Sequence, residues 1–307
     1  MGTWYKIRYY IGHPIIRYYT RHPLVLLKNR CIMARLWWKK ISGKDVNFDD
    51  KVSSDVPIDV VMAAAEKDYG VLVHVIDSIR EYVRHPLGTI FIISPKSEAI
   101  VALCREKQCV FIDENTVLPV TKKDIRYFVS GIDRSGWLFQ QLLKWSGDVY
   151  ATHEYFLITD ADTVFCRPQK FVDQGKVIMP ASGQFCHIPY LTTYRKLTGE
   201  TVEAVVNFTS HHVLVQKSKM AALKRKIEAH CGTEWYRAIM DNIDVNEGSF
   251  VSDYETYGQY VYSTYPDECV LEHWRNVSLR RSQLDQLAET TQKYYPRRKT
   301  ISFHGYR

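Results

Sequence analysis

The sequence predicts an α/β fold built on a mostly parallel sheet, and two observations lead to that prediction. Short apolar, β-prone runs alternate with amphipathic stretches of helical period, an order typical of parallel strands joined by right-handed crossover helices. One run, residues 155–159, leads directly into two carboxylates, as a buried central strand does at a ligand-binding edge. Helices are expected on both faces of this mixed, Rossmann-like sheet.

Residues 1–54 are expected to form a basic extension before the main domain. The first 44 residues contain ten Lys or Arg and no acid, so the rest of the chain sums to −3 within a net charge of +7. Aromatic residues alternate with these cations, which favours a segment that associates with an anionic membrane surface. Two alternatives stay open: a helical extension packed on the main domain, and nucleic-acid binding, which is not the favoured partner. The aromatic residues are Trp4, Tyr5, Tyr9, Tyr10, Tyr18, Tyr19, Trp37 and Trp38.

The composition indicates a folded domain in a reducing compartment. With 46% hydrophobic and 24% charged residues, the 307-residue chain is typical of globular proteins. Its seven cysteines include no Cys-x-x-Cys pair and favour neither a disulfide framework nor a zinc site. No apolar run approaches the roughly 20 residues of a membrane-spanning helix, and the start lacks the pattern of a secretion signal. We therefore expect a cytoplasmic location, with peripheral contact to the inner face of the cell membrane.

The main domain, residues 55–307, is expected to begin after a polar segment rich in turn-forming residues. Three strand–helix units precede the strand at 155–159, and the alternation loosens beyond residue 165. We therefore divide the domain into a regular half, 55–165, and a less regular half, 166–307. The expected strands are 58–64, 89–94, 109–114, 155–159 and 177–180, with a strand pair or one broken strand over 202–215; the expected helices are 71–83, 100–107, 136–145, 218–231 and 234–239.

Asp160 and Asp162 directly follow the strand at 155–159. In extended or turning backbone, carboxylates two residues apart can face one small volume, where their charges repel unless a divalent cation neutralises them. Hard oxygen ligands of this kind suit Mg²⁺ or Mn²⁺. The pair therefore predicts a metal site at the carboxyl edge of the sheet, with a surface turn after a core strand as the alternative.

An apolar strand that ends in Asp-x-Asp resembles the metal and nucleotide-sugar signature of the GT-A glycosyltransferases. The order of the strand–helix units is similar to their nucleotide-binding half, which would be 55–165 here, with 166–307 as the acceptor half. Over residues 57–307 the resemblance implies a GT-A fold and a UDP- or GDP-sugar donor. It is closest to bacterial proteins of this type associated with surface polysaccharides. It implies transfer of a hexosyl group, with inversion, to a glycan or lipid-linked acceptor.

The resemblance also implies roles for residues that bind the donor. The His-Gly pair at His304 is similar to the histidine that completes the metal shell in several GT-A families, although the Lys-Pro-Trp that follows there is missing. Asp160, Asp162 and His304 would then hold Mn²⁺ or Mg²⁺, with the ribose as an alternative partner of Asp160. The loop after the first strand would contact base and ribose through Asp68, unless Asp68 is a helix N-cap. Arg307 would pair with the pyrophosphate.

One helix face before the central strand carries further candidates. Trp137, Gln140, Gln141 and Lys144 recur at spacings of three and four, so they share a face of the helix predicted at 136–145. If this face lines the cleft, Gln140 or Gln141 is expected to bond the donor and Lys144 to offset phosphate charge, and Gln141 and Lys144 are kept as the candidates. The alternative is a solvated polar face with Trp137 in the core.

The acceptor half offers two candidates for a catalytic base. An inverting transfer needs a carboxylate to take the proton of the acceptor hydroxyl. Inverting GT-A enzymes draw it from the region well after Asp-x-Asp, which implies Asp253 or Glu255. Alternatively, Ser252 caps a helix and Glu255 lies in its first turn. The adjacent His211 and His212 are expected to be structural, with contact of one of them to substrate as the alternative, because neighbours on a strand point to opposite faces.

Two other functions fit part of the same sequence pattern. Residues 160–164 also resemble the Asp-x-Asp-x-Thr/Val loop of haloacid-dehalogenase-like phosphatases, which would make Asp160 a nucleophile. That loop opens its domain, whereas three strand–helix units precede it here. The third function, a non-catalytic membrane adaptor, is disfavoured because both carboxylates and His304 are present.

Overall fold

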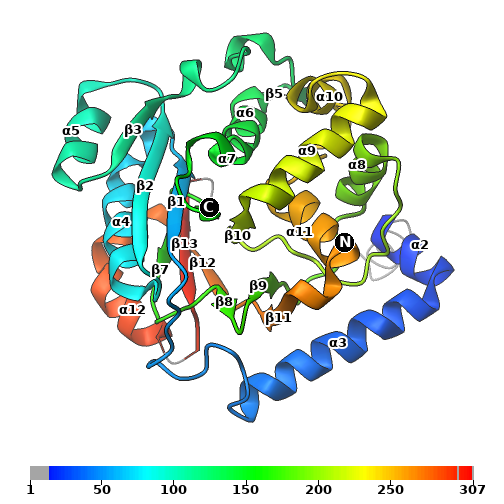
Figure 1. The fold of residues 1–307 in the computed structure, drawn as a ribbon, viewed down its shortest axis with the longest axis horizontal. Coiled ribbons are helices and arrows are strands. Elements are labelled where there is room, and N and C mark those ends of the chain that lie inside the picture. The colour runs from blue at the N-terminus through cyan, green and yellow to red at the C-terminus, as the bar shows by residue number, and fades with distance from the viewer. Residues whose placement is uncertain (1–13, 296, 306–307) are drawn as a thin grey trace, which may run out of the picture.

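A computed structural model describes residues 14–295 and 297–305 of the chain (Figure 1). In this part of the chain, five strands form the central sheet: β10 (His212–Gln216), β6 (Tyr155–Thr159), β1 (Ile58–Ala63), β2 (Leu87–Ser94) and β3 (Val110–Asp113), in that spatial order. All neighbours pair in parallel except β10, which runs antiparallel to β6. The predicted α/β class with a mostly parallel sheet is confirmed.

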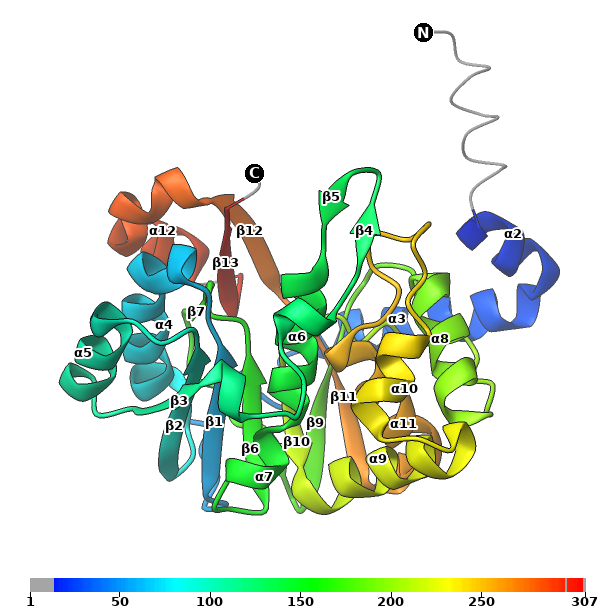
Figure 2. The same ribbon diagram turned by 90° about the horizontal axis from the view of Figure 1, so that it is seen from above.

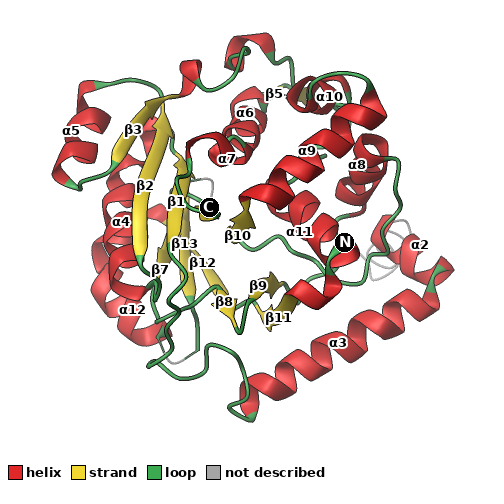
Figure 3. Ribbon diagram, in the orientation of Figure 1, coloured by secondary structure: helices red, strands yellow, loops and turns green. Residues whose placement is uncertain are grey.

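The central strands form where the sequence is apolar without interruption. All six residues of β1 are buried, and β6 is buried from its second residue onward. Strands of a parallel sheet are apolar along their whole length because helices cover both of their faces. Figure 3 shows helices on both sides of the strands. The helices of the main domain are α4 (Tyr69–Tyr82), α5 (Glu98–Glu106), α6 (Ser135–Trp145), α7 (Gly147–Tyr150), α8 (Ile188–Thr198), α9 (Lys217–Cys231), α10 (Trp235–Asp241), α11 (Asp253–Thr264) and α12 (Leu287–Tyr294).

Smaller sheets bring the end of the chain beside the central sheet. β13 (Thr300–His304) lies between β12 (Asn276–Arg280) and β7 (Thr163–Phe165), parallel to the first and antiparallel to the second (Figure 2). Because β7 begins just after Asp162, this pairing carries the last described residues to the Asp-x-Asp segment. The other strands are β8 (Val172–Asp173), β9 (Lys176–Ala181) and β11 (Cys269–His273), which form a sheet in the order β11-β9-β8, and the hairpin strands β4 (Phe128–Val129) and β5 (Ile132–Asp133).

One expected pair of strands is wrong in its first half. Only residues 212–216 of the predicted strand pair form a strand, and the stretch 202–208 is irregular apart from an isolated bridge between Ser182 and Asn207. Its backbone carbonyls instead accept hydrogen bonds from the N-terminal extension. The Tyr19 hydroxyl donates to the Ala204 carbonyl at 2.7 Å, and the Asn29 amide donates to the Val205 carbonyl at 2.7 Å.

The N-terminal extension consists of α2 (Pro14–Arg21) and α3 (Pro23–Ile41) in its described part. Both helices lie against residues 166–307 of the domain, so the alternative of a packed helical extension holds for residues 14–41. No helix within the described ranges is long and apolar enough to cross a membrane. The predicted aromatic positions in residues 1–13 lie outside the described residues.

Candidate functional site

A pocket of about 340 Å³ lies at the carboxyl ends of β1 and β6. Its lining comes from the loop after β1, the inner face of α6, the segment after β6, the first residues of α11 with the segment before them, and the end of β13, together with residues of α8 and of the segment before β10. Its lining includes all predicted site residues except Glu255, and Arg307 lies outside the described residues. The predicted residues in the lining are Asp68, Gln141, Lys144, Asp160, Asp162, Asp253 and His304, joined by Trp137 and Gln140 from the predicted helix face.

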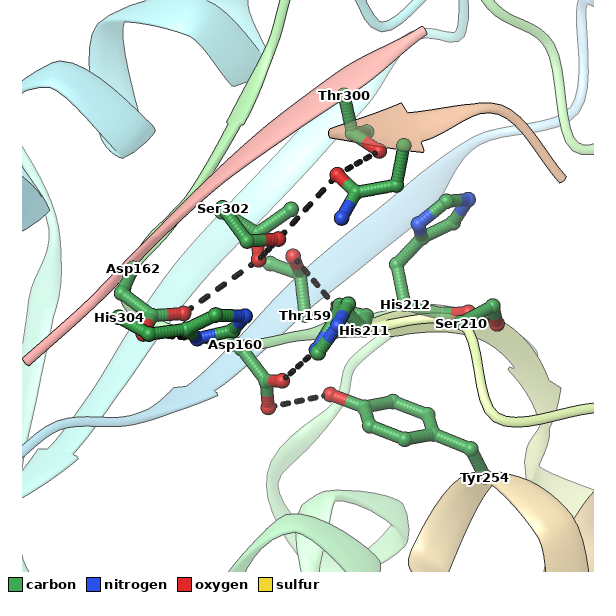
Figure 4. Close-up of polar contacts among 12 residues, drawn as sticks. Thr159, Asp160, Asp162, Ser210, His211, His212, Tyr254, Thr300, Ser302 and His304 are labelled. Atoms are coloured by element: carbon green, nitrogen blue, oxygen red, sulfur yellow. Dashed lines mark hydrogen bonds and ion pairs between the residues drawn. The ribbon is translucent and has the colours of Figure 1, made fainter. Parts of the chain in front are cut away.

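Asp160 is held by three side chains and stays ionised. Its Oδ1 lies 2.9 Å from Lys144 Nζ. The same oxygen accepts a hydrogen bond from the Tyr254 hydroxyl at 2.6 Å, and Oδ2 lies 2.9 Å from His211 Nδ1 (Figure 4). Burial alone would raise the pKa of Asp160, but Lys144, His211 and Tyr254 outweigh it and lower that pKa well below its usual range. The segment after β6 therefore presents a fixed negative charge to the pocket.

Lys144 connects this charge to a second carboxylate. Its buried Nζ lies 2.9 Å from Asp160 Oδ1 and 2.7 Å from Asp253 Oδ2. Burial would lower the pKa of Lys144, but the two carboxylates raise it above its usual range. The charge of Lys144 is therefore already matched by protein carboxylates, which leaves it less able to offset phosphate charge than the sequence suggested.

Asp253 differs from Asp160 in how readily it takes up a proton. It is 2% exposed, and burial raises its pKa, with Asp160 adding to the rise and Lys144 opposing it. Its backbone N–H donates to Gln141 Oε1 at 3.1 Å, which fixes the start of α11 against α6. Two carboxylates whose pKa values are shifted in opposite directions by their surroundings are typical of acid–base sites.

Asp162 and His304 meet across the β7–β13 pair. His304 Nδ1 lies 3.2 Å from Asp162 Oδ2, and the backbone N–H of Phe303 donates to the Asp162 carbonyl at 2.8 Å. The register of the two strands is fixed beside this contact: Ser302 pairs with Thr163, and the hydroxyl oxygens of the two residues lie 2.9 Å apart (Figure 4). The contact between Asp162 and a histidine of the chain end is therefore set by backbone pairing.

Two of the three predicted metal ligands are well placed to bind a divalent cation. Asp162 and His304 offer a carboxylate oxygen and an imidazole nitrogen side by side, and both suit Mn²⁺. Asp160 fits less well, because both of its oxygens already accept hydrogen bonds or ion pairs. Across residues 14–295 and 297–305, no group of three or more His, Cys, Asp or Glu side chains is arranged to hold a metal ion. Asp162 and His304 are therefore the two side chains that would hold a cation here.

Asp68 is fixed by a residue that the sequence did not single out. Its Oδ1 accepts a hydrogen bond from Arg281 Nη2 at 2.7 Å, and its Oδ2 accepts one from the Ala65 N–H at 3.2 Å. Asp68 is the N-cap residue of α4, as in the alternative, but its side chain makes no capping hydrogen bond to that helix. Its contact with a donor stays a prediction, now with Arg281 beside it.

Glu255 does not line the pocket, which corrects its candidacy as base. It is fully buried in the first turn of α11 and accepts hydrogen bonds from the Phe208 N–H at 2.6 Å and from Gln259 Nε2 at 2.9 Å. Ser252 is the N-cap of this helix, since its Oγ accepts from the Glu255 N–H at 3.2 Å. The structural alternative is therefore confirmed for both residues, and Asp253 is the remaining candidate.

Glu255 predicts a pH dependence of stability. Burial raises the pKa of Glu255 from an ordinary value of 4.5 to about 7. A group whose pKa is raised by folding stabilises the protein fully below its unfolded value and loses that contribution as the pH rises through its folded value. Between pH 4 and pH 8 we expect the unfolding free energy of the wild type to fall by about 3 kcal/mol relative to Glu255→Gln. Urea unfolding of both proteins across this range measures the difference, and parallel pH profiles would contradict it.

His211 belongs to the site, although its neighbour His212 is structural as expected. His211 has a left-handed backbone conformation, with φ of 63°, immediately before β10. This conformation breaks the alternation of a strand and directs the ring toward Asp160, whereas His212 packs against Phe165 and Phe171 in the core. Burial lowers the pKa of His212 to about 3, so it stays neutral. The adjacent pair of histidines was the available signal in the sequence.

Comparison with known proteins places the chain in a family. Residues 50–298 match the model described as "Family of unknown function (DUF6492)", so the chain belongs to this family. No curated protein sequence matched. Among solved structures, mouse xyloside xylosyltransferase 1 is similar at a TM-score of 0.44 and 14% identity, over 82% of this chain and 99% of that one. The galactosyltransferase LgtC, in complex with donor and acceptor sugar analogs, is similar at a TM-score of 0.43 and 13% identity, over 81% and 87% of the two chains.

Proposed function

We propose that this member of the DUF6492 family is a metal-dependent glycosyltransferase that moves a hexosyl group from a UDP- or GDP-sugar to a glycan or lipid-linked acceptor, as in polysaccharide biosynthesis. The observation that carries the proposal is the contact between Asp162 and His304 beside an ionised Asp160, at the carboxyl edge of a parallel sheet. Ligands of open α/β sheets bind at this edge. The proposal includes a cytoplasmic location with peripheral contact to the inner face of the cell membrane.

The donor would lie between the loop after β1 and the segment after β6. Asp162 and His304 would hold Mn²⁺ or Mg²⁺, and such an ion neutralises charge on a departing diphosphate when bound. Asp160 would keep the rings of His211 and Tyr254 in place through the bonds they already make. Asp68 and Gln141 line this pocket, and Arg281 bonds Asp68. These side chains would orient the nucleotide part of the donor.

Asp253 would serve as the base of an inverting transfer. Its carboxylate would take the proton from the acceptor hydroxyl as that oxygen forms its bond to the anomeric carbon. The bond from the anomeric carbon to the diphosphate breaks in the same step, and the diphosphate leaves with the bonding electrons. The raised pKa of Asp253 makes its carboxylate a stronger base than an ordinary aspartate, which suits this role.

Asparagine at position 253 tests the base directly. We expect Asp253→Asn to lower kcat for transfer at least a hundredfold, the usual contribution of a general base, with little change in KM for the donor. Glu255→Gln is the matched control two residues away, and it is expected to leave kcat within a few-fold of the wild type because Glu255 is absent from the pocket. Equal losses in both variants would point to a structural cause and would count against Asp253 as base.

The function itself is tested with purified protein, a panel of nucleotide sugars, and Mn²⁺ or EDTA. We expect hydrolysis or transfer of one donor that stops on chelation, and binding of UDP or GDP that requires the metal. Turnover of phosphate esters without any nucleotide-sugar turnover would contradict the proposal and support the phosphatase alternative. That alternative needs Asp160 as nucleophile, and the three donors that hold its oxygens disfavour it.

A further inference from the structure

Helix α3 is apolar on two opposite faces. Its inner face packs on the domain through Val25 and Leu36, which are buried, and through Asn29, which bonds the Val205 carbonyl. The opposite face carries a row of small and large apolar residues at spacings of three and four, which places them along one side of the helix. We call this row the outer stripe: Leu24, Leu27, Cys31, Ala34, Trp38 and Ile41.

The outer stripe is exposed in the described part of the chain. Leu24 is 71% exposed, Leu27 59%, Trp38 61% and Ile41 52%, and Cys31 and Ala34 are exposed too. Scattered apolar residues on a surface are ordinary, but a continuous row along a 19-residue helix marks a site of interaction. Figure 1 shows α3 running along the outer edge of the molecule, on the side away from β1, β2 and β3.

Cations flank the stripe without any compensating acid on the same helix. Arg35 and Lys39 lie beside it on one side, and Arg30 lies toward the other. The first 44 residues contain no Asp or Glu. A helix with an apolar row, a Trp in that row and a basic border has the features of an element that lies in the interface of a bilayer with anionic lipids.

We infer that the outer stripe of α3 is a membrane-docking surface that binds the headgroup region of anionic bilayers, with the helix lying parallel to the membrane plane. Apolar side chains of the stripe enter the boundary of the acyl chains, and the border cations contact lipid phosphates. The helix already docks on the domain by its inner face, so membrane contact requires no unfolding of the extension. This inference rests on the peripheral membrane contact included in the proposed function and gives it a surface, but it does not depend on the transfer reaction.

A second copy of the chain is the competing occupant of the stripe. Apolar residues at such spacings also form helix pairs, and charges beside the seam then decide which partners pair. In a pair of α3 helices the border would bring cations against cations, with no acid on either helix to match them. The charges therefore favour an anionic lipid surface over self-association.

Vesicle flotation of the full chain tests the inference. We expect wild-type protein to float with vesicles of phosphatidylcholine mixed with phosphatidylglycerol, to float poorly with phosphatidylcholine alone, and to lose binding as salt is raised. Leu27→Glu/Trp38→Glu is expected to abolish flotation, because each substitution places a carboxylate in the apolar stripe. Arg35→Gln/Lys39→Gln is expected to weaken binding to the mixed vesicles about tenfold or more, from the loss of two border charges.

Val149→Glu is the matched control, since Val149 is a 73% exposed apolar residue on α7, away from the stripe. It is expected to float like the wild type. Flotation of Leu27→Glu/Trp38→Glu, or failure of the wild type to bind, would overturn the inference. A wild-type dimer in sedimentation that becomes a monomer in Leu27→Glu/Trp38→Glu would assign the stripe to a second copy instead. Metal-dependent nucleotide binding, measured on the same samples, reports separately on the proposed function and on folding.

Discussion

Replacing Asp162 with asparagine is expected to lower kcat/KM for nucleotide-sugar turnover about a thousandfold. Asparagine keeps the shape of the side chain and can still bond His304, but it removes the negative charge that would hold a divalent ion. A bound ion contributes several kcal/mol to the stabilisation of a departing diphosphate, and about 4 kcal/mol corresponds to a thousandfold in rate. Turnover at saturating metal measures the loss, and a thermal shift with UDP and Mn²⁺ measures binding.

The control for this variant is an aspartate of the same type outside the pocket. Asp49 is exposed in the linker before β1, so Asp49→Asn is expected to keep wild-type turnover and the wild-type thermal shift. The thermal shift produced by UDP with Mn²⁺ should be absent in Asp162→Asn, and in the wild type it should disappear when EDTA is added. Full activity of Asp162→Asn in EDTA would remove the metal from the mechanism.

The sequence predicted most of the sheet and one face of the site, because both depend on local patterns. Uninterrupted apolar runs located β1 and β6, and the helical period of Gln141 and Lys144 correctly placed both on the pocket side of α6. Asp160 and Asp162 followed from their position after an apolar run. These features can be recognised from residues that are neighbours in the sequence.

Other contacts of the site depend on partners far along the chain. Tyr254 and Lys144 reach Asp160 from helices that are separated by more than 100 residues, as the hydrogen bond between the two side chains shows. His211 was expected to follow the alternation of a strand, and its left-handed backbone broke that rule. Residues 202–208 were expected to be a strand because they are β-prone, but their carbonyls bind the N-terminal helices instead. No local sequence pattern shows which distant segment bonds to these side chains and carbonyls.

Replacing Lys144 with methionine is expected to lower the unfolding free energy by about 3–5 kcal/mol at pH 8. Methionine has a similar length, so the change removes the charge with little change in packing. Asp253, whose side chain is fully buried, and Asp160, whose side chain is 27% exposed, then lie close together without their cation, and breaking a buried ion pair from one side costs this much because an unpaired charge remains. Urea unfolding at pH 8 measures the loss.

Lys224→Met is the matched control. Lys224 is also a buried lysine, but Nζ pairs with one carboxylate, Asp148 Oδ1, at 2.6 Å. Because Lys224→Met leaves one carboxylate without its cation instead of two, a smaller loss of unfolding free energy is expected. The double variant Lys144→Met/Asp253→Asn should recover part of the loss of Lys144→Met, since it leaves one stranded carboxylate. Similar losses in Lys144→Met and Lys224→Met would show that the second carboxylate adds nothing.

The pH dependence of the loss of unfolding free energy in Lys144→Met identifies the cause of that loss. Without Lys144, folding raises the pKa values of Asp160 and Asp253 above their unfolded values of about 3.9. The loss should therefore grow as the pH rises from 4 to 8, because the carboxyls of the folded variant are protonated at the acid end of this range and ionise, at a cost in stability, as the pH passes their raised folded values. Asp253 is expected to protonate first, because burial already raises its pKa in the wild type. A loss that stays constant from pH 4 to pH 8 would instead assign the effect to packing, and the buried charge cluster would then have no measurable role in holding α6, α11 and the Asp-x-Asp segment together.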